Sequence, residues 1–345
     1  MEKLKAKISL PNKNYKSDQD IILNFELYNP NDEGVYALTW YTPLEGLWSD
    51  CFKVTRNGES VPYDGPLAKR GQPTAEDYVF INGGGSVSKE VSIGQAYQVS
   101  EEGEYEAKLV TNIVDYVQIE TKELNSKTLE NSSARENIQS IESNALHFTV
   151  EAGENRKATS GESVRSLSKV STSTAGAKDP IFDGGNNSQQ DEVKKAHFDS
   201  FFLIEKSLSS LADDRKYKEW FGSYDNARFN KVKDVYSKIK DRMEGTAFTY
   251  VLSGSGCKRN TYAYTYKGSD KIWLCDLFWK ADPIGTDSKA GTMVHEHAHA
   301  SASIDDIVYG QAKARKLAQD EPEKAIKNAD NYEYYSEPFS DDLPV

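Results

Sequence analysis

Long apolar runs and an excess of basic residues are both missing from this chain of 345 residues. A membrane-spanning helix needs roughly 18 or more consecutive apolar residues. No stretch approaches that length, so no membrane span is expected. The formal net charge of -12 argues against a nucleic-acid or anionic-membrane partner, because both bind basic surfaces. The acidic balance would instead suit a cationic ligand.

The amino-terminal residues also lack the pattern of a secretion signal. The sequence MEKLKAKISLPNKNY of residues 1–15 carries positive charges, but no apolar core follows them. We therefore expect no signal peptide in the printed chain. Either the protein stays inside the cell, or a signal was removed ahead of Met1.

Cysteine is scarce, with three residues in the whole chain. Cys257 and Cys275 flank an apparent hairpin, and Cys51 stands far from both in the sequence. A pair plus an odd residue fits one disulfide formed in an oxidising compartment. Three buried free thiols fit the count equally well.

Residues 1–150 have the pattern of a β domain. Short segments rich in Val, Ile, Tyr and Phe are separated by turn sequences such as Asn57-Gly58. Evenly spaced short strands of this kind predict an antiparallel β-sandwich of the immunoglobulin-like type. The expected strands are 5–10, 21–28, 34–40, 50–56, 86–92, 103–110 and 147–150.

The pattern changes twice after residue 150. Residues 151–188 are rich in Ser, Thr, Gly and Ala and nearly empty of large apolar side chains, which predicts a flexible linker. Residues 189–345 are mainly helical in pattern with a small β-sheet, so the predicted fold class is α+β in two domains. The expected helices are 192–212, 225–243, 288–302, 306–318 and 322–335, and the expected strands are 247–252, 262–266 and 271–275.

Three of the five histidines stand between residues 295 and 299, in a segment that Thr286 or Asp287 can cap as a helix. His295 and His299 are four residues apart, so both rings lie on one helical face and can bind one zinc ion. Glu296 can reach a metal-bound water and act as its general base. The alternative is a solvated, histidine-rich helix face.

The other histidines carry no such pattern. His297 points away from the face that holds the presumed ligands, so a packing or supporting role is expected for it. His147 and His197 stand alone in the sequence and are expected to be structural.

A catalytic zinc needs a third protein ligand and an open position. The nearest downstream carboxylates are Asp305 and Asp306, of which Asp306 is favoured, and Glu321 and Glu323 lie farther along. Tyr309, one turn after Asp306 in the predicted helix, could donate to the oxyanion of a tetrahedral intermediate. Alternatively, the two aspartates cap the next helix and Tyr309 belongs to the core.

The string HEHAH followed shortly by DxxYG resembles the deuterolysin-type aspzincins, which are zinc endopeptidases with an aspartate as third ligand. Within them it looks most like the peptidyl-Lys metalloendopeptidases. The resemblance implies a zincin-like domain with His295, His299 and Asp306 on one Zn²⁺, Glu296 as base and Tyr309 as transition-state donor. It runs through segments 220–225, 272–279, 285–296, 306–311 and 328–337.

The same resemblance implies a pocket for lysine. The positions that match the acidic pair of the lysine-specific members are Asp330 and Glu333, three apart on one helical face. Two carboxylates can hold an ammonium group, so lysine-containing protein or peptide substrates would be cut on the amino side of lysine. A solvated acidic helix end is the alternative.

Three departures from the fungal lysine-specific enzymes stand out. The link between His299 and Asp306 is shorter, and Ser303-Ile304 replaces the usual Gly-Thr, which leaves Asp305 open as the third ligand. One of the two fungal disulfides is matched by Cys257 and Cys275, which implies that these two are bonded. Cys51 would then be free.

The family also implies a secreted enzyme whose β-rich propeptide precedes the catalytic domain, and residues 1–150 fit that place. We hypothesise that this domain inhibits the enzyme through the turn-rich loop 64–71, with Lys69 in the acidic pocket as a substrate mimic. A lysine-directed enzyme could also cut its own linker before Lys157, Lys169 or Lys178.

Two other readings remain. The β domain could be a delivery or adhesion module, with the second domain acting as a toxin-like protease effector that needs no maturation. The chain could also be an inactive zincin that serves as a binding protein.

Overall fold

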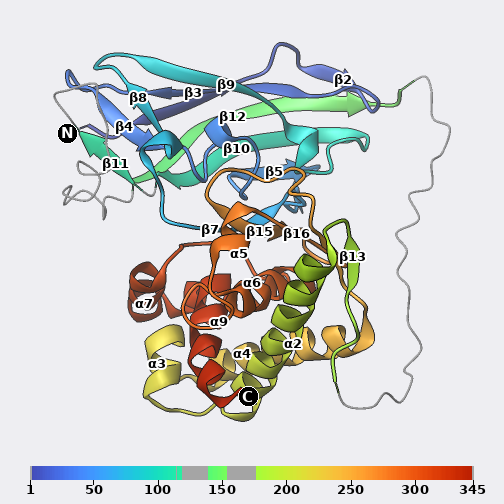
Figure 1. Cartoon of the computed structure of the whole chain (residues 1–345). Helices are drawn as coiled ribbons and strands as arrows, with labels where there is room; N and C mark the ends of the chain where they lie inside the picture. The colour runs from blue at the N-terminus through green and yellow to red at the C-terminus, as the bar shows by residue number, and fades with distance from the viewer. Residues whose placement is uncertain (1, 114, 119–138, 154–175, 344–345) are drawn as a thin grey trace. The chain divides into compact units, whose positions relative to one another are not determined.

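The structure is a computed structural model that describes residues 2–113, 115–118, 139–153 and 176–343 (Figure 1). It contains both sheets and helices, which confirms the α+β class. The chain divides into two compact units. One is Met1–Pro66 with Pro73–Arg165, and the other is Leu67–Gln72 with Ser166–Val345. Most of the predicted linker, with Lys157 and Lys169, lies outside the described residues.

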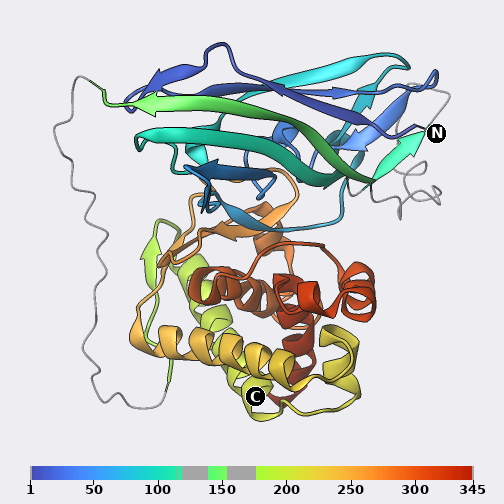
Figure 2. The same ribbon diagram turned by 180° about the vertical axis from the view of Figure 1, so that it is seen from behind.

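The strands of the first unit form three sheets (Figures 1 and 2). Each of the seven predicted strands overlaps an observed one, and all pairings are antiparallel except that of β2 with β12. The immunoglobulin-like sandwich remains a prediction. The sheets are β1 (Lys5–Ser9), β3 (Ile22–Tyr28) and β9 (Ser86–Ser92); β2 (Asn14–Lys16), β12 (Gln139–Glu151), β10 (Gly103–Ile113), β5 (Phe52–Arg56) and β6 (Glu59–Val61); and β11 (Tyr116–Gln118), β4 (Val35–Leu38) and β8 (Tyr78–Ile81).

Alternating burial explains the strands of the first unit. In β3 the side chains of Leu23, Phe25 and Leu27 are buried, and their neighbours are less so. This period of two places one face of a strand against a core. Across β10 and β12, the rings of Tyr105 and Phe148 stack with centroids 5.2 Å apart.

The second unit has a five-stranded sheet whose edge strand comes from the early part of the chain. Its order is β13 (Ile181–Asp183), β14 (Thr249–Val251), β16 (Lys271–Leu274), β15 (Thr261–Thr265) and β7 (Leu67–Arg70). In Figure 1 the blue β7 pairs with the orange β15, antiparallel, with Lys69 opposite Ala263. We expected a turn-rich loop here; residues 67–70 are instead a strand, because the edge of β15 offers them backbone partners.

Eight helices of the described chain complete the second unit, and α6 lies at their centre. It packs against α2, α4 and α9, and every residue from Lys289 to Ala300 is buried. None of the helices in the described part is both long and apolar enough to cross a bilayer. The helices are α2 (Asn187–Ser209), α3 (Arg215–Phe221), α4 (Asn226–Gly245), α5 (Asp276–Lys280), α6 (Lys289–Ala302), α7 (Gln311–Asp320), α8 (Pro322–Ala325) and α9 (Ala329–Ser336).

Two helical predictions need correction. The helix expected at 306–318 begins only at Gln311, because the side-chain oxygen of Asn328 accepts from the N–H groups of Ile307 and Val308 at 2.8 and 3.1 Å. These bonds hold the preceding residues in a non-helical path. The helix expected at 322–335 is broken into α8 and α9.

The cysteines, His197 and His297 take structural places, whereas His147 is exposed on β12. Cys257 and Cys275 form a disulfide, the pairing that the family resemblance implies, and Cys51 is a buried thiol. The Tyr250 hydroxyl lies 2.8 Å from His197 Nδ1 and 3.0 Å from His297 Nε2. Burial lowers the pKa of both imidazoles, that of His197 to about 4. These neutral rings tie α6 to β14 and α2.

Replacing Tyr250 by Phe removes a hydroxyl that two buried rings share. A buried polar group left without a partner costs about 1–3 kcal/mol. We therefore expect urea unfolding of Tyr250→Phe to show a loss of about that size. Tyr224→Phe is the matched control, because the Tyr224 side chain is exposed. Equal unfolding midpoints for the two variants would contradict this account.

Candidate metal and catalytic site

Helix α6 presents the HExxH residues from within the core. The Ser288 hydroxyl accepts from the N–H of Gly291 at 3.0 Å and caps the helix. The cap is therefore Ser288, not Thr286 or Asp287 as we expected. The helix ends at Ser303, which adopts a left-handed φ of 57°. The side chains of His295, Glu296 and His299 are all fully buried, so the predicted alternative of a solvated face is wrong.

The structure brings Asp306 to the two presumed histidine ligands. Its Oδ1 lies 3.1 Å from His295 Nε2, and its Oδ2 lies 3.2 Å from His299 Nε2. Asp305 instead pairs with the ammonium of Lys267 in a partly exposed position. Geometry therefore favours Asp306 over Asp305 as the carboxylate of this cluster.

The donor atoms of this cluster fit a bound cation. The Nε2 atoms of both histidines and Oδ1 of Asp306 are buried, and within the described residues none has a hydrogen-bond partner outside this cluster. The ligand atoms all lie within 4.8 Å of one another. Unsatisfied buried polar atoms are costly, and two imidazoles with one carboxylate are donors that zinc prefers. His295, His299 and Asp306 together therefore suit a zinc ion.

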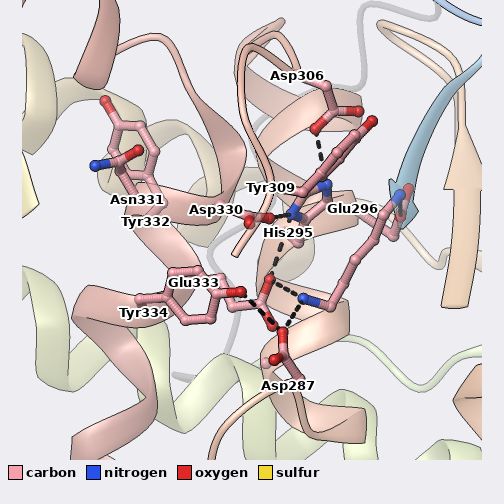
Figure 3. A network of polar contacts seen from close by, with 12 residues as sticks. Asp287, His295, Glu296, Asp306, Tyr309, Asp330, Asn331, Tyr332, Glu333 and Tyr334 are labelled. Carbon is pink, nitrogen blue, oxygen red and sulfur yellow. Dashed lines mark hydrogen bonds and ion pairs between the residues drawn. The ribbon is translucent and has the colours of Figure 1, made fainter. Parts of the chain in front are cut away.

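The far side of each imidazole is already occupied. His299 Nδ1 lies 2.7 Å from the carbonyl oxygen of Ile304. His295 Nδ1 lies 2.9 Å from Asp330 Oδ1 (Figure 3). Such contacts fix ring orientation and leave Nε2 for a metal. The other oxygen of Asp330 accepts from the N–H of Gly310 at 2.6 Å. A second close group, His295 with Asp330 and Glu333, is thereby used for orientation.

Glu296 and Tyr309 both contact one peptide bond of β7. Glu296 Oε1 accepts from the N–H of Lys69 at 3.2 Å, and the Tyr309 hydroxyl donates to the carbonyl oxygen of Ala68 at 2.8 Å. Burial raises the pKa of Glu296 to about 7, although His295 and His299 oppose the rise. A base and a hydroxyl donor therefore flank the Ala68–Lys69 bond.

The Lys69 side chain fills an acidic pocket. Its Nζ lies 2.7 Å from Glu333 Oε2 and 2.8 Å from Asp287 Oδ1, contacts that Figure 3 shows as dashed lines. The rings of Tyr262 and Tyr334 lie 5.1 and 5.5 Å from the same atom. Burial alone would lower the pKa of Lys69, but Glu333 and the other acidic neighbours outweigh it and raise the pKa well above its ordinary value. The buried amine is therefore charged.

Sequence reasoning missed Asp287 and placed Asp330 differently. Of the predicted pair, Glu333 contacts the ammonium and also lies 3.3 Å from His295 Nδ1, whereas the carboxylate oxygens of Asp330 contact only His295 and Gly310 among the interactions of the described residues. Both members of the pair are buried, so a solvated acidic helix end is excluded. The sequence feature that could have identified Asp287 is its position directly before the helix that carries His295 and His299, where we predicted only a possible cap.

Known proteins resemble this chain over most of its length. Residues 207–337 match the family model of the aspzincins, described as lysine-specific metallo-endopeptidase. An extracellular protease of Aeromonas hydrophila is 33% identical over 93% of this chain and 89% of its own length. The chain belongs to the aspzincin family. A sequence and a solved structure from Grifola frondosa are also similar to this aspzincin.

The peptidyl-Lys metalloendopeptidase of Grifola frondosa is 29% identical over 85% of this chain and 81% of its own. A solved zinc peptidase from the same organism is 36% identical, covering 44% of this chain and 96% of its own, with a TM-score of 0.42. As an aspzincin, the chain is a zinc-dependent metalloendopeptidase, as the HExxH helix predicted. The reading as an inactive binding protein is thereby disfavoured.

Proposed function

We propose that this aspzincin is the latent precursor of a secreted endopeptidase that cleaves on the amino side of lysine. The observation that carries the proposal is the position of the Ala68–Lys69 peptide bond. Its carbonyl oxygen accepts from Tyr309 and its N–H donates to Glu296, while the lysine side chain lies in the acidic pocket. A substrate bound in the same way would present the bond before its lysine to the catalytic groups.

The chemistry assigns one role to each side chain. His295, His299 and Asp306 would hold Zn²⁺, which lowers the pKa of a bound water and polarises the substrate carbonyl. Glu296 takes the proton from the attacking water and returns it to the leaving amide nitrogen, the atom that already lies 3.2 Å from its Oε1. Tyr309 donates to the carbonyl oxygen as negative charge develops there.

Latency follows from the same contacts. While β7 pairs with β15 and Lys69 fills the pocket, a lysine substrate has no access to either. Residues on both sides of Leu67–Gln72 belong to the first unit, which supports its role as an inhibitory propeptide. The alternative of a delivery module active without maturation predicts an open site, and an occupied site speaks against it.

Release by self-processing in the linker is the natural next step. Lys157 and Lys169 lie outside the described residues. Lys178 donates its backbone N–H to the carbonyl of Met243 at 2.9 Å and its ammonium to that of Gly245 at 2.7 Å. A cut before Lys178 would first have to break these bonds, so Lys157 and Lys169 are the favoured sites.

Zinc content distinguishes the two aspartates. Asp306→Asn replaces a charged ligand by a neutral one, so we expect a purified full-length variant to hold much less than one zinc per chain. Asp305→Asn is the matched control, since the Asp305 side chain pairs with Lys267, and it should retain wild-type zinc. Metal analysis after dialysis measures both. The reverse pattern would make Asp305 the ligand.

Glu296→Gln tests the base without removing a metal ligand. We expect full zinc occupancy with a loss of peptidase activity of about 10²–10⁴-fold, the usual contribution of a general base. Wild-type enzyme should release peptides that begin with lysine, and a chelator should stop it. Mass spectrometry of a substrate protein digested with and without chelator measures both the first residue of each peptide and the inhibition. Cleavage after lysine, or spontaneous maturation of pure Glu296→Gln, would contradict the proposal.

Lys69→Ala tests latency. Truncating one partner of a buried ion pair costs about 2–5 kcal/mol, which should open the site roughly 30-fold or more. We therefore expect the intact precursor of Lys69→Ala to cleave a lysine peptide from the first minutes, before the linker is cut. Lys89→Ala, an exposed lysine of the first unit, should stay latent like wild type. If the Lys69→Ala precursor stayed latent, the hypothesis that the Lys69 side chain blocks the acidic pocket would be wrong.

A further inference from the structure

We propose that Asp287, together with Glu333, binds the ammonium group of the substrate lysine, and that Asp330 is a positioning residue for His295. This assignment rests on the lysine specificity proposed above. It differs from the pair that the sequence suggested, in which Asp330 and Glu333 both face the lysine. The difference matters because one of the two carboxylates that contact the lysine ammonium then comes from the loop before α6 and not from α9.

The contacts of Lys69 show which carboxylates meet an ammonium here. Glu333 and Asp287 accept from Nζ at 2.7 and 2.8 Å. An ammonium has three N–H donors, and charge-assisted bonds of this length are strong. Glu333 is fully buried, whereas the Asp287 side chain is 36% exposed. Glu333 therefore forms the floor of the pocket and Asp287 stands nearer its mouth.

Asp287 is held ready for this contact. Its backbone has a left-handed φ of 53°, a conformation that Asp tolerates better than most residues. The next residue, Ser288, caps α6, and the hydroxyl of Tyr334 on α9 donates to Asp287 Oδ1 at 2.9 Å. The carboxylate is thus fixed from two sides and is also the acceptor nearest the pocket mouth.

The oxygens of Asp330 contact other groups. Oδ1 lies 2.9 Å from His295 Nδ1, and Oδ2 accepts from the Gly310 N–H at 2.6 Å. The first contact sets the orientation of a zinc-ligating ring, and the second holds the segment between Asp306 and α7. The negative charge of Asp330 still favours a nearby ammonium, but its bonds serve the metal side of the site.

The floor of the pocket depends on a glycine of the zinc helix. A Cβ at Gly291 would lie 2.9 Å from Glu333 Oε1 and 2.5 Å from Glu337 Oε1. The missing side chain at Gly291 therefore lets the carboxyl groups of Glu333 and Glu337 lie close to the backbone of α6. Burial and the neighbouring Glu333 raise the pKa of Glu337 to about 10, and the carboxylates that contact the ammonium are those of Glu333 and Asp287.

Two isosteric variants separate the roles. Full-length Asp287→Asn, Asp330→Asn and wild type are brought to the same processed form with a trace of active enzyme. Each is then assayed on two peptides that differ only in lysine or uncharged norleucine after the scissile bond. Zinc affinity is measured in parallel by competition with a chelator. Asp282→Asn is the control, since it lies in the same loop with an exposed side chain.

For Asp287→Asn we expect unchanged zinc affinity and a lysine-to-norleucine ratio of kcat/KM that falls about fivefold or more, because the pair that is lost is partly exposed on the Asp287 side. For Asp330→Asn we expect zinc affinity to fall about 10–100-fold. Its lysine-to-norleucine ratio at saturating zinc should fall less than that of Asp287→Asn, because Asp330 acts on the ammonium through its charge and not through a direct contact. Asp282→Asn should match wild type in both measurements.

A wild-type ratio in Asp287→Asn, or a ratio in fully zinc-loaded Asp330→Asn that falls as far as that of Asp287→Asn, overturns the assignment while the lysine specificity stands. If wild type itself shows no preference for lysine over norleucine, the proposed specificity falls and the assignment falls with it. Asn tolerates the left-handed backbone of position 287, and an unchanged zinc affinity also reports that the fold is intact.

Discussion

The buried ammonium of Lys69 is the charge on which the occupied site depends. Its side chain is 1% exposed, and an ion without partners at that depth would cost several kcal/mol. The fully buried carboxylate of Glu333 would carry a similar cost without a positive partner. Each charge is tolerated because the other is present. The buried Glu333 carboxylate therefore requires a cationic partner. Under the proposed function this one requirement explains both latency and lysine specificity, because only another cation can replace the Lys69 ammonium when β7 leaves the site.

Helix α9 connects this requirement to the metal. Asp330 contacts the His295 ring, and three residues later Glu333 contacts the lysine ammonium. Both side chains project from the same buried face, so a shift of α9 would disturb metal orientation and specificity together. The helix is held by contacts with α6 and by the hydrogen bond of the Tyr236 hydroxyl to the Tyr332 carbonyl at 2.8 Å.

Sequence patterns predicted what local chemistry determines. The zinc helix was expected at 288–302 and is observed at Lys289–Ala302, because its residue types and spacing are both local signals. The segment around Asp306 was misassigned as helix because its hydrogen-bond acceptor, Asn328, lies some twenty residues away. Strand β7 was missed for a similar reason: its partner β15 is distant in sequence. Asp287 was seen only as a cap, since its contact with Lys69 is tertiary.

Under the proposed function, the pairing of β7 with β15 has a consequence for which lysines the enzyme can use. A substrate that replaces β7 must offer its backbone to the edge of β15, and it can do so only when several residues around the lysine are extended. A lysine within a helix has its backbone groups already engaged and cannot adopt that path without local unfolding. The sheet edge would thus select substrates by backbone conformation, and a lysine in a helix would be cleaved only after local unfolding.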